Sequence, residues 1–584
     1  MHVVVHKGIP DSKDLQSAWQ TLVQTVDRPQ IFYTYEWARS VARAYEGSLD
    51  PLLITAFDEG ELVGVAALAA NYSDRQASFL AGTTADYCDF ICIEHYRKQF
   101  VDQVLEKIED LGVETLVLAN LPADSPTAWI LREIGRRRGF SILSRPAYHC
   151  AQVIFRSGGE RAAVKNAASQ KQVVRRHLKA LGKLGQVRIE HLTGEAEVTQ
   201  ALPEFARMHV SRFLSTGKLS SLASNERREF LRELTREFSG TGQVVLSRLT
   251  FQGYPIAYHF GFRFGDAWFW YQPTFDTEFQ QYSPGLCLLA KIIEAAAEDP
   301  ALQMVDLGLG AEDYKGRWSS QGRDTLHVIA SRSSLTYCRE AVRYHVGRTI
   351  QRNPRLLRAV RRGFAATLAM KRRNQSPWEI AISLGEKISD RVMNGPEIIF
   401  FEKPESDAVV SEMRILPATM NLFASAAMHY AEDSETLNYL VRASARVGCS
   451  SYRGLVLVDD NELPVHFCWV TPFEKFYLSE LKREVSAPEP NSTLIFDCWT
   501  PGSKRGKGHY ASTISQIAAD IHRSGSRAWI FAAATRLSSL RGIRKAGFVE
   551  RFSVVLRRSG LRRTAIYSDI SPTLGAMTQA SSAA

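Results

Sequence analysis

The chain has 584 residues, of which 45% are apolar and 23% charged, and its formal net charge is +10. This length leaves room for about three or four domains that each bury a core. No apolar run approaches the ~20 residues of a membrane span and the first residues do not resemble a signal peptide, so we expect a cytoplasmic globular protein. Its eight cysteines show neither a CxxC pair nor zinc-like His/Cys spacing, which argues against a disulfide framework or a metal site.

Three polar turns between apolar, β-rich runs recur at domain-sized spacing. They lie at residues 58–64, 251–257 and 459–465, where Gly60, Gly253 and Asn461 tolerate a turn backbone. Each turn is followed by strand sequence and then by a helix. The sequence therefore predicts an α/β protein with mixed, twisted sheets flanked by helices, built from three similar units.

Residues 165–183 are predicted to be a helix that carries six Lys and Arg side chains. Such a helix can steer an anionic cofactor or acceptor toward a site. The alternative is a solvated face without a ligand.

A strand predicted at residues 268–274 is followed by a well-marked helix start. Ser283 stands at the N-cap position and Pro284 at the first helical position. The amides of Gly285 and Leu286 can bind a pyrophosphate with help from the helix dipole. Alternatively, this is an ordinary helix start and Ser283 caps those amides itself.

Residues 304–307 form a short apolar run that ends in Gly-Leu-Gly, and a helix is predicted at residues 311–318. Asp306, Tyr314 and Lys315 then lie near the carboxyl end of a strand, where open α/β sheets bind ligands. Such residues can orient an amine or protonate a leaving group. The alternative is a solvated helix above a buried Trp318.

The segment 282–318 resembles the signature of the CelD-type acetyltransferases of the GNAT superfamily, which are akin to the Fem-type aminoacyltransferases. The resemblance extends in order over residues 32–333 and includes Asp86-Tyr87-Cys88-Asp89. It implies two tandem GNAT folds, with the cofactor helix in the second. It also implies acetyl-CoA or another acyl-CoA as co-substrate, and a small-molecule or lipid-linked sugar acceptor in exopolysaccharide or cell-envelope synthesis.

On this interpretation six residues of the second unit receive roles. We expect Ser283, Gly285 and Leu286 to bind the cofactor, and Asp306 and Tyr314 to move a proton or orient the acceptor. Lys315 is expected to hold an anionic group on either substrate. In direct transfer a base deprotonates the acceptor, backbone N–H groups polarise the acyl carbonyl, and an acid protonates the departing thiolate.

Residues 336–373 contain ten Arg, one Lys and one Glu, a net charge of +10. Leucine, valine and phenylalanine recur among them at near-helical spacing. This composition is typical of a basic amphipathic helix on an anionic membrane surface, which would place the protein at the inner membrane face. A solvated connector is the alternative, and a nucleic-acid patch is possible although no recognised nucleic-acid-binding fold is present.

A third GNAT-like unit is predicted from a strand at residues 496–499, a loop at 501–508 and a helix at 510–521. Arg505, Gly506 and Gly508 resemble the GNAT motif for acyl-CoA, and we expect them to bind the cofactor unless this is a basic surface loop. Tyr510, however, stands where the motif has a small residue. Two further departures, at Arg536 and Ile543, leave open whether this unit is catalytic.

The predicted organisation has a first GNAT-like unit at 1–157, a second at 158–335, a basic helical linker at 336–395, a third unit at 396–570 and a disordered tail at 571–584. The predicted activity is that of a GNAT-type N-acetyltransferase that uses an amine or hydroxyl acceptor. One alternative is a Fem-like transferase that uses aminoacyl-tRNA, which would give the basic helices a partner. The other is a non-catalytic GNAT scaffold.

Overall fold

The computed structural model describes residues 1–310, 312–319, 321–352, 394–405, 413–559 and 562–569. The chain divides into an N-terminal unit (Met1–Arg212 with Ser221–Arg358) and a C-terminal unit (Phe213–Ser220 with Ala359–Ala584). Most of the predicted basic linker and the predicted tail lie outside the described residues. No helix in the described residues is long and apolar enough to cross a membrane.

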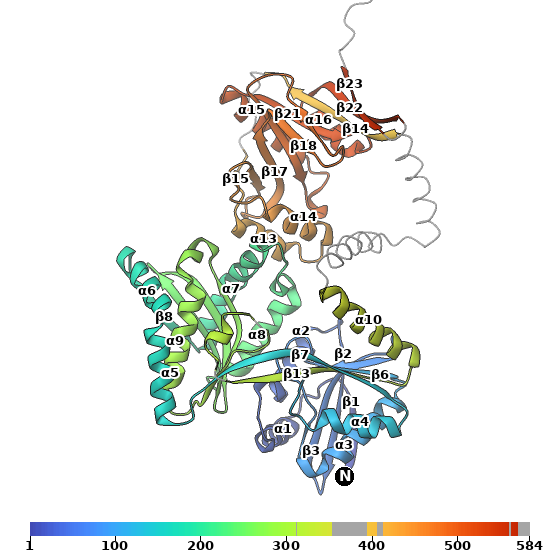
Figure 1. The fold of residues 1–584 in the computed structure, drawn as a ribbon, viewed down its shortest axis with the longest axis vertical. Helices are drawn as coiled ribbons and strands as arrows, with labels where there is room; N and C mark the ends of the chain where they lie inside the picture. The colour runs from blue at the N-terminus through green and yellow to red at the C-terminus, as the bar shows by residue number, and fades with distance from the viewer. Residues whose placement is uncertain (311, 320, 353–393, 406–412, 560–561, 570–584) are drawn as a thin grey trace, which may run out of the picture. The chain divides into compact units, whose positions relative to one another are not determined.

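The N-terminal unit has two halves, each with its own helices (Figure 1). The first half contains β1 (His2–Lys7), α1 (Lys13–Thr25), α2 (Tyr35–Ala44), β2 (Asp50–Asp58), β3 (Glu61–Asn71), β4 (Gln76–Phe79), β5 (Ile91–Cys92), α3 (Arg97–Asp110), β6 (Thr115–Pro122), α4 (Thr127–Arg137) and β7 (Ser141–Ile154). Its β4, α3 and β6 form a β-α-β unit in which the two strands pair in parallel.

The second half repeats this plan. It contains α5 (Gly158–Gln170), α6 (Gln172–Leu184), β8 (Val187–Leu192), α7 (Glu195–Ser215), α8 (Asn225–Ser239), β9 (Val244–Phe251), β10 (Tyr254–Phe264), β11 (Ala267–Phe275), α9 (Pro284–Glu298), β12 (Met304–Asp306), β13 (Gln321–Ser331) and α10 (Ser334–Arg352). Here β11, α9 and β12 form the parallel β-α-β unit. The apolar face of α9, with Leu288, Leu289, Ile292 and Ile293, is fully buried in the core of this half.

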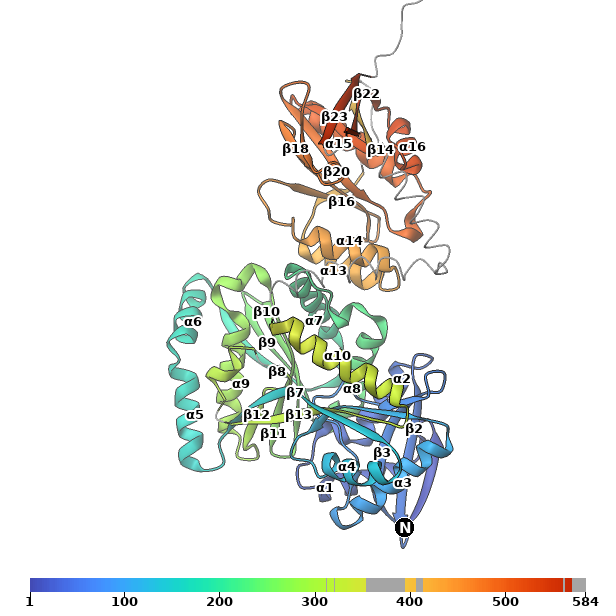
Figure 2. The same ribbon diagram turned by 45° about the vertical axis from the view of Figure 1, so that its right-hand side comes forward.

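The two halves exchange strands, so that one sheet runs through the N-terminal unit. Its order is β1-β2-β3-β4-β6-β13-β7-β12-β11-β10-β9-β8, with β5 paired to β3. The strand β7, from the first half, pairs with β12 of the second, while β13 returns from the second half to pair with β6. Both strands cross between the halves in Figures 1 and 2. This exchange fixes the halves relative to each other through backbone hydrogen bonds.

The predicted turns and helices differ from the structure in three places. The turns after β2 and β9 use Gly60 and Gly253 at positive φ, but in the third turn the left-handed residue is Glu462 rather than Asn461. The basic helix predicted at 165–183 is broken at Lys171 into α5 and α6. In the described part of 311–318 the regular structure is the 3₁₀ turn Lys315–Arg317 rather than an α-helix.

The C-terminal unit contains β14 (Asn394–Lys403), β15 (Ile415–Pro417), α13 (Met420–His429), α14 (Ser434–Ser444), β16 (Arg453–Val458), β17 (Pro464–Pro472), β18 (Lys475–Leu478), β19 (Arg483–Ser486), β20 (Ser492–Trp499), α15 (His509–Arg523), β21 (Arg527–Ala533), α16 (Leu537–Lys545), β22 (Val549–Ser559) and β23 (Arg562–Asp569). Its main sheet has the order β15-β16-β17-β20-β21-β14-β22-β23. As in both halves of the N-terminal unit, a helix connects two parallel strands, here β20 and β21.

Candidate active site

The candidate site lies where β11 and β12 separate. The two strands pair from Ala267↔Met304 to Phe269↔Asp306; β12 then ends, whereas β11 continues to Phe275. The helix α9 begins beyond the carboxyl end of β11. Crevices of this kind, outside the carboxyl ends of parallel strands, are the usual ligand sites of open α/β sheets.

The start of α9 suits the phosphate end of an anionic ligand. Ser283 is the N-cap, but its side chain makes no capping hydrogen bond, so it does not compete for the helix amides. The Leu286 N–H donates to the Ser283 carbonyl at 3.0 Å, which corrects the expectation that this amide is free. No hydrogen bond of the described residues engages the Gly285 N–H. A Cβ at Gly285 would lie 3.3 Å from Cδ1 of Phe275, closer than most side-chain contacts, so glycine lets the Phe275 ring pack against this helix start.

A cation adjoins this helix start. The Arg212 guanidinium lies over the Phe275 ring at 4.6 Å and donates to the Pro273 carbonyl at 3.1 Å. Burial lowers the pKa of Arg212, while the neighbouring Tyr314 and Glu312 raise it. Arg212 was not among the residues predicted from sequence, because nothing in the sequence around it marks one arginine of α7 as facing β11.

Asp306 is the buried end of β12 and lies at the junction of the two halves. It is 1% exposed and accepts hydrogen bonds from Tyr87 Oη at 2.8 Å, Gln152 Nε2 at 2.7 Å and the Gly308 N–H at 2.9 Å. Burial raises its pKa, and these donors oppose the rise. With three donors around one carboxylate, Asp306 is better placed to hold the strand end than to pass a proton.

Asp86, from the first half, lies against the loop that follows β12. A Cβ at Gly308 would lie 2.4 Å from Asp86 Oδ2 and 3.2 Å from the Trp270 carbonyl oxygen, so the carboxylate packs against the backbone beyond β12. Burial raises the pKa of Asp86 to about 7, with a further contribution from the charge of Asp306. Two adjacent carboxylates with different surroundings are a common arrangement for general acid and base catalysis.

Lys315 is held within its own loop. It is 4% exposed, and its Nζ donates to the Leu309 carbonyl at 2.6 Å and pairs with Glu312 at 2.9 Å. Its positive charge lowers the pKa of Asp86 against the effect of burial. Lys315 therefore lowers the pKa of Asp86 by its charge, and its contacts with Leu309 and Glu312 stabilise the loop that follows β12.

Tyr314 is half-buried and accepts a hydrogen bond from Trp270 Nε1 at 3.4 Å. Burial raises its pKa, which keeps the phenol protonated near neutral pH. The Trp270 ring in turn stacks on His259 with ring centroids 4.2 Å apart. The tyrosine is thus positioned by a rigid aromatic pair on β10 and β11.

The segment that carries Asp86 also borders a cavity on its far side. Cys88, Asp89 and Tyr33 are among the residues that line this cavity, whose volume is about 30 Å³. A water molecule needs about 10–15 Å³ of such space, so the cavity has room for about two. Asp89 accepts from Ser125 Oγ at 2.5 Å and from the Phe90 N–H at 2.8 Å, so it is paired by the protein itself. The cavity is too small for a substrate.

The structure brings Ser283, Gly285, Leu286, Asp306, Tyr314 and Lys315 to one end of the sheet in the second half. Arg505, Gly506 and Gly508 belong to the C-terminal unit, at the start of α15. From sequence, Asp86 is only part of the motif that resembles the family and receives no role. Its place beside Gly308 depends on contacts between the two halves.

Residues 168–316 match the family described as the Acetyltransferase (GNAT) domain. No curated protein matches the chain. The mixed, twisted sheets flanked by helices confirm the predicted α/β fold class, and the matched residues contain β8 to β12 with α9.

Three solved structures illustrate proteins to which the chain is similar. FemX shares 10% identity, with 56% of this chain and 97% of FemX covered and a TM-score of 0.41. A tandem GNAT protein from the clavulanic acid biosynthesis pathway shares 14% (57% and 99% covered, TM-score 0.34). L-PGS from Bacillus licheniformis shares 10% (60% and 99% covered, TM-score 0.36). At these TM-scores the similarities do not identify a substrate.

Proposed function

We propose that the N-terminal unit transfers an acyl group from coenzyme A to an amine or hydroxyl acceptor. The observation that supports this most is the position of Asp86. The first half contributes a buried carboxylate, with a pKa of about 7, that packs against the backbone just beyond β12 of the second half. A general base is most effective when its pKa is close to the working pH.

The residues of the crevice then have distinct tasks. The start of α9 holds the phosphates through the Gly285 amide, with Arg212 as the neighbouring cation. Bound acyl-CoA supplies an activated thioester carbonyl. Asp86 accepts the proton of the acceptor, and Tyr314 donates a proton to the leaving sulfur. Asp306 and Lys315 position this arrangement.

On the resemblance to CelD-type proteins we further propose an acceptor of exopolysaccharide or cell-envelope synthesis, such as a sugar amine. The test is turnover with acetyl-CoA and a panel of amino sugars, read as release of free thiol. Asp86→Asn should lower kcat by about 10²–10⁴, the usual contribution of a general base. Full activity in this variant would contradict the assignment of the base.

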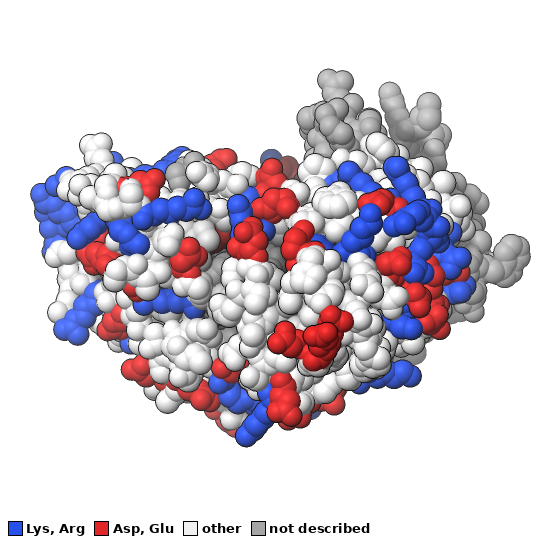
Figure 3. Space-filling view, turned by 90° about the horizontal axis from the view of Figure 1, so that it is seen from below, with Lys and Arg blue, Asp and Glu red and all other residues white. Residues whose placement is uncertain are grey.

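A basic surface favours one second candidate, a Fem-like transfer from aminoacyl-tRNA. Lys and Arg gather at the left edge of Figure 3, over α5 and α6, and residues 161–188 carry eight cations and no acid. Four exposed cations of α6 are Arg175, Arg176, Lys179 and Lys183. Polyanions bind such surfaces with a strong dependence on salt. Titrating the protein with acyl-CoA and with aminoacyl-tRNA in parallel distinguishes the donors, because binding of the tRNA alone would reject the CoA proposal.

A further inference from the structure

The C-terminal unit contains a crevice built like that of the second half. Its parallel strands pair from Ser492↔Arg527 to Ile495↔Ile530 and continue to Trp499 and Ala533 without further pairing to each other. Asp497 on the separating part of β20 has a left-handed backbone, with φ of 45°. The crevice therefore opens between the ends of β20 and β21, where α15 and α16 begin.

The loop before α15 leaves room for a phosphate. Gly506 and Gly508 have φ of 81° and 83°, and a Cβ at either would meet no atom within 4 Å. Two cations of this loop are already paired, however. Lys504 pairs with Asp459 at 3.2 Å, and Arg505 pairs with Glu435 at 3.2 Å.

The crevice of the C-terminal unit differs from that of the second half at the second residue of its helix. In α9 the N-cap is Ser283 and the second helical residue is Gly285, whereas in α15 the N-cap is Gly508 and the second helical residue is Tyr510. The glycine at the second position of α9 is thus replaced by a tyrosine in α15.

Tyr510 packs across the crevice. A Cβ at Gly542 of α16 would lie 2.5 Å from Cδ1 of Tyr510, so the ring rests on the α16 backbone. On its other side the ring centroid is 5.6 Å from that of His466 on β17. The ring therefore occupies the space between α15, α16 and the sheet.

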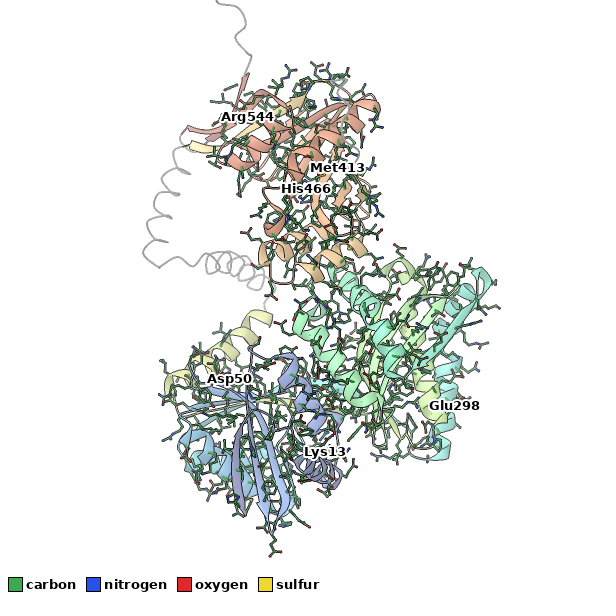
Figure 4. All side chains as sticks on the ribbon, turned by 180° about the vertical axis from the view of Figure 1, so that it is seen from behind. Lys13, Asp50, Glu298, Met413, His466 and Arg544 are labelled. Carbon is green, nitrogen blue, oxygen red and sulfur yellow. The ribbon has the colours of Figure 1, made fainter. Side chains whose placement is uncertain are left out.

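The surroundings of His466 show that the space beside the Tyr510 ring is apolar. His466 is 1% exposed, and its Nδ1 is 2.7 Å from Thr500 Oγ1, while its Nε2 has no hydrogen-bond partner in the described residues. Figure 4 shows His466 inside the C-terminal unit. Burial lowers its pKa to about 3, so the ring is neutral. A buried nitrogen without a partner is uncommon, and here the aromatic ring of Tyr510 lies beside it.

We propose that Tyr510 closes the crevice in which this unit would hold the arm of an acyl-CoA, so that the C-terminal unit takes no acyl-CoA. The chain then has one such site, at α9; this second statement rests on the proposed function. The departures at Arg536 and Ile543 agree with a unit that has kept the fold and lost the thioester chemistry.

Isothermal titration of the full chain with coenzyme A tests the proposal. The native chain should bind one equivalent, and Gly285→Val should bind it at least tenfold more weakly. Tyr510→Ala opens the crevice and should add a second equivalent, in the Gly285→Val background as well. Tyr510→Phe should add none because the ring still fills the space. Tyr477→Ala, at a 59% exposed tyrosine of the same unit, is the matched control.

Each outcome decides between the two claims. Unchanged affinity in Gly285→Val would reject the site at α9, whereas two equivalents in the native chain would overturn the closed crevice. So would a folded Tyr510→Ala variant, checked by circular dichroism, that gains no binding. Absence of binding to the native chain would reject the CoA site at α9. A gain of binding in Tyr510→Ala would still support the closure of the C-terminal crevice by Tyr510. If Tyr510→Ala does not fold, the stoichiometry of the native chain and the affinity of Gly285→Val decide.

Discussion

The raised pKa of Asp86 predicts that an increase in pH lowers the stability of the protein and raises its activity. Burial raises the pKa of Asp86 from the ordinary 3.8 to about 7 in the folded protein. Its contribution to stability is therefore fully present below about pH 4 and is lost as the pH rises through about 7. A difference of about three units at 1.36 kcal/mol each amounts to about 4 kcal/mol of unfolding free energy. Over the same range the carboxylate becomes deprotonated, so turnover should rise.

The variant Asp86→Asn removes this titration while keeping the shape of the side chain. Urea unfolding of the native chain and the variant between pH 4 and 8 gives the test, because any constant cost of the amide cancels in the difference. Relative to the native chain, the variant should gain about 4 kcal/mol from pH 4 to pH 8. The same substitution at the exposed Asp50 controls for net charge. Parallel pH curves for Asp86→Asn and the native chain would refute the reasoning.

Three further predictions concern neighbouring features. Gly285→Val should lower affinity for coenzyme A by at least tenfold while costing only ~0.5 kcal/mol in helix propensity, as measured by calorimetric titration and urea unfolding; unchanged affinity would exclude this helix start. Asp306→Ala leaves three buried donors unpaired and should destabilise the protein by about 3–6 kcal/mol, whereas loss of activity at unchanged stability would assign Asp306 to proton transfer instead. Liposome sedimentation tests whether residues 336–373 bind an anionic membrane. Binding should favour anionic vesicles, weaken with salt and fall when the exposed Arg339 and Arg343 become Gln. Equal recovery of the protein in all supernatants would contradict membrane binding.

The sequence predicted most of the second half because its signals are local. The N-cap and proline before α9, the turn at Gly253 and the apolar strand before Asp306 each depend on neighbours in the chain. The exchange of β7 and β13 was not predictable, since both are ordinary strands by composition and only their partners are unusual. The same limit applied to the site. Asp306 and Lys315 were predicted from their positions in the sequence. Their partners could not be predicted in this way: the hydrogen bonds of Asp306 with Tyr87 and Gln152 depend on tertiary contacts, and the ion pair of Lys315 with Glu312 depends on the loop conformation.

The exchanged strands also bear on the proposed mechanism, in which a base from one half serves a site in the other. Asp86 must stay buried at its present distance from Gly308 for its pKa to remain near 7, because a carboxylate that swung into water would return to its ordinary value. Hydrogen bonds between β7 and β12, and between β13 and β6, hold the two halves in one sheet and so maintain that distance. A single half, even one that folds, would lack either the base or the crevice. The tandem arrangement is therefore a requirement of this site rather than a duplication of it.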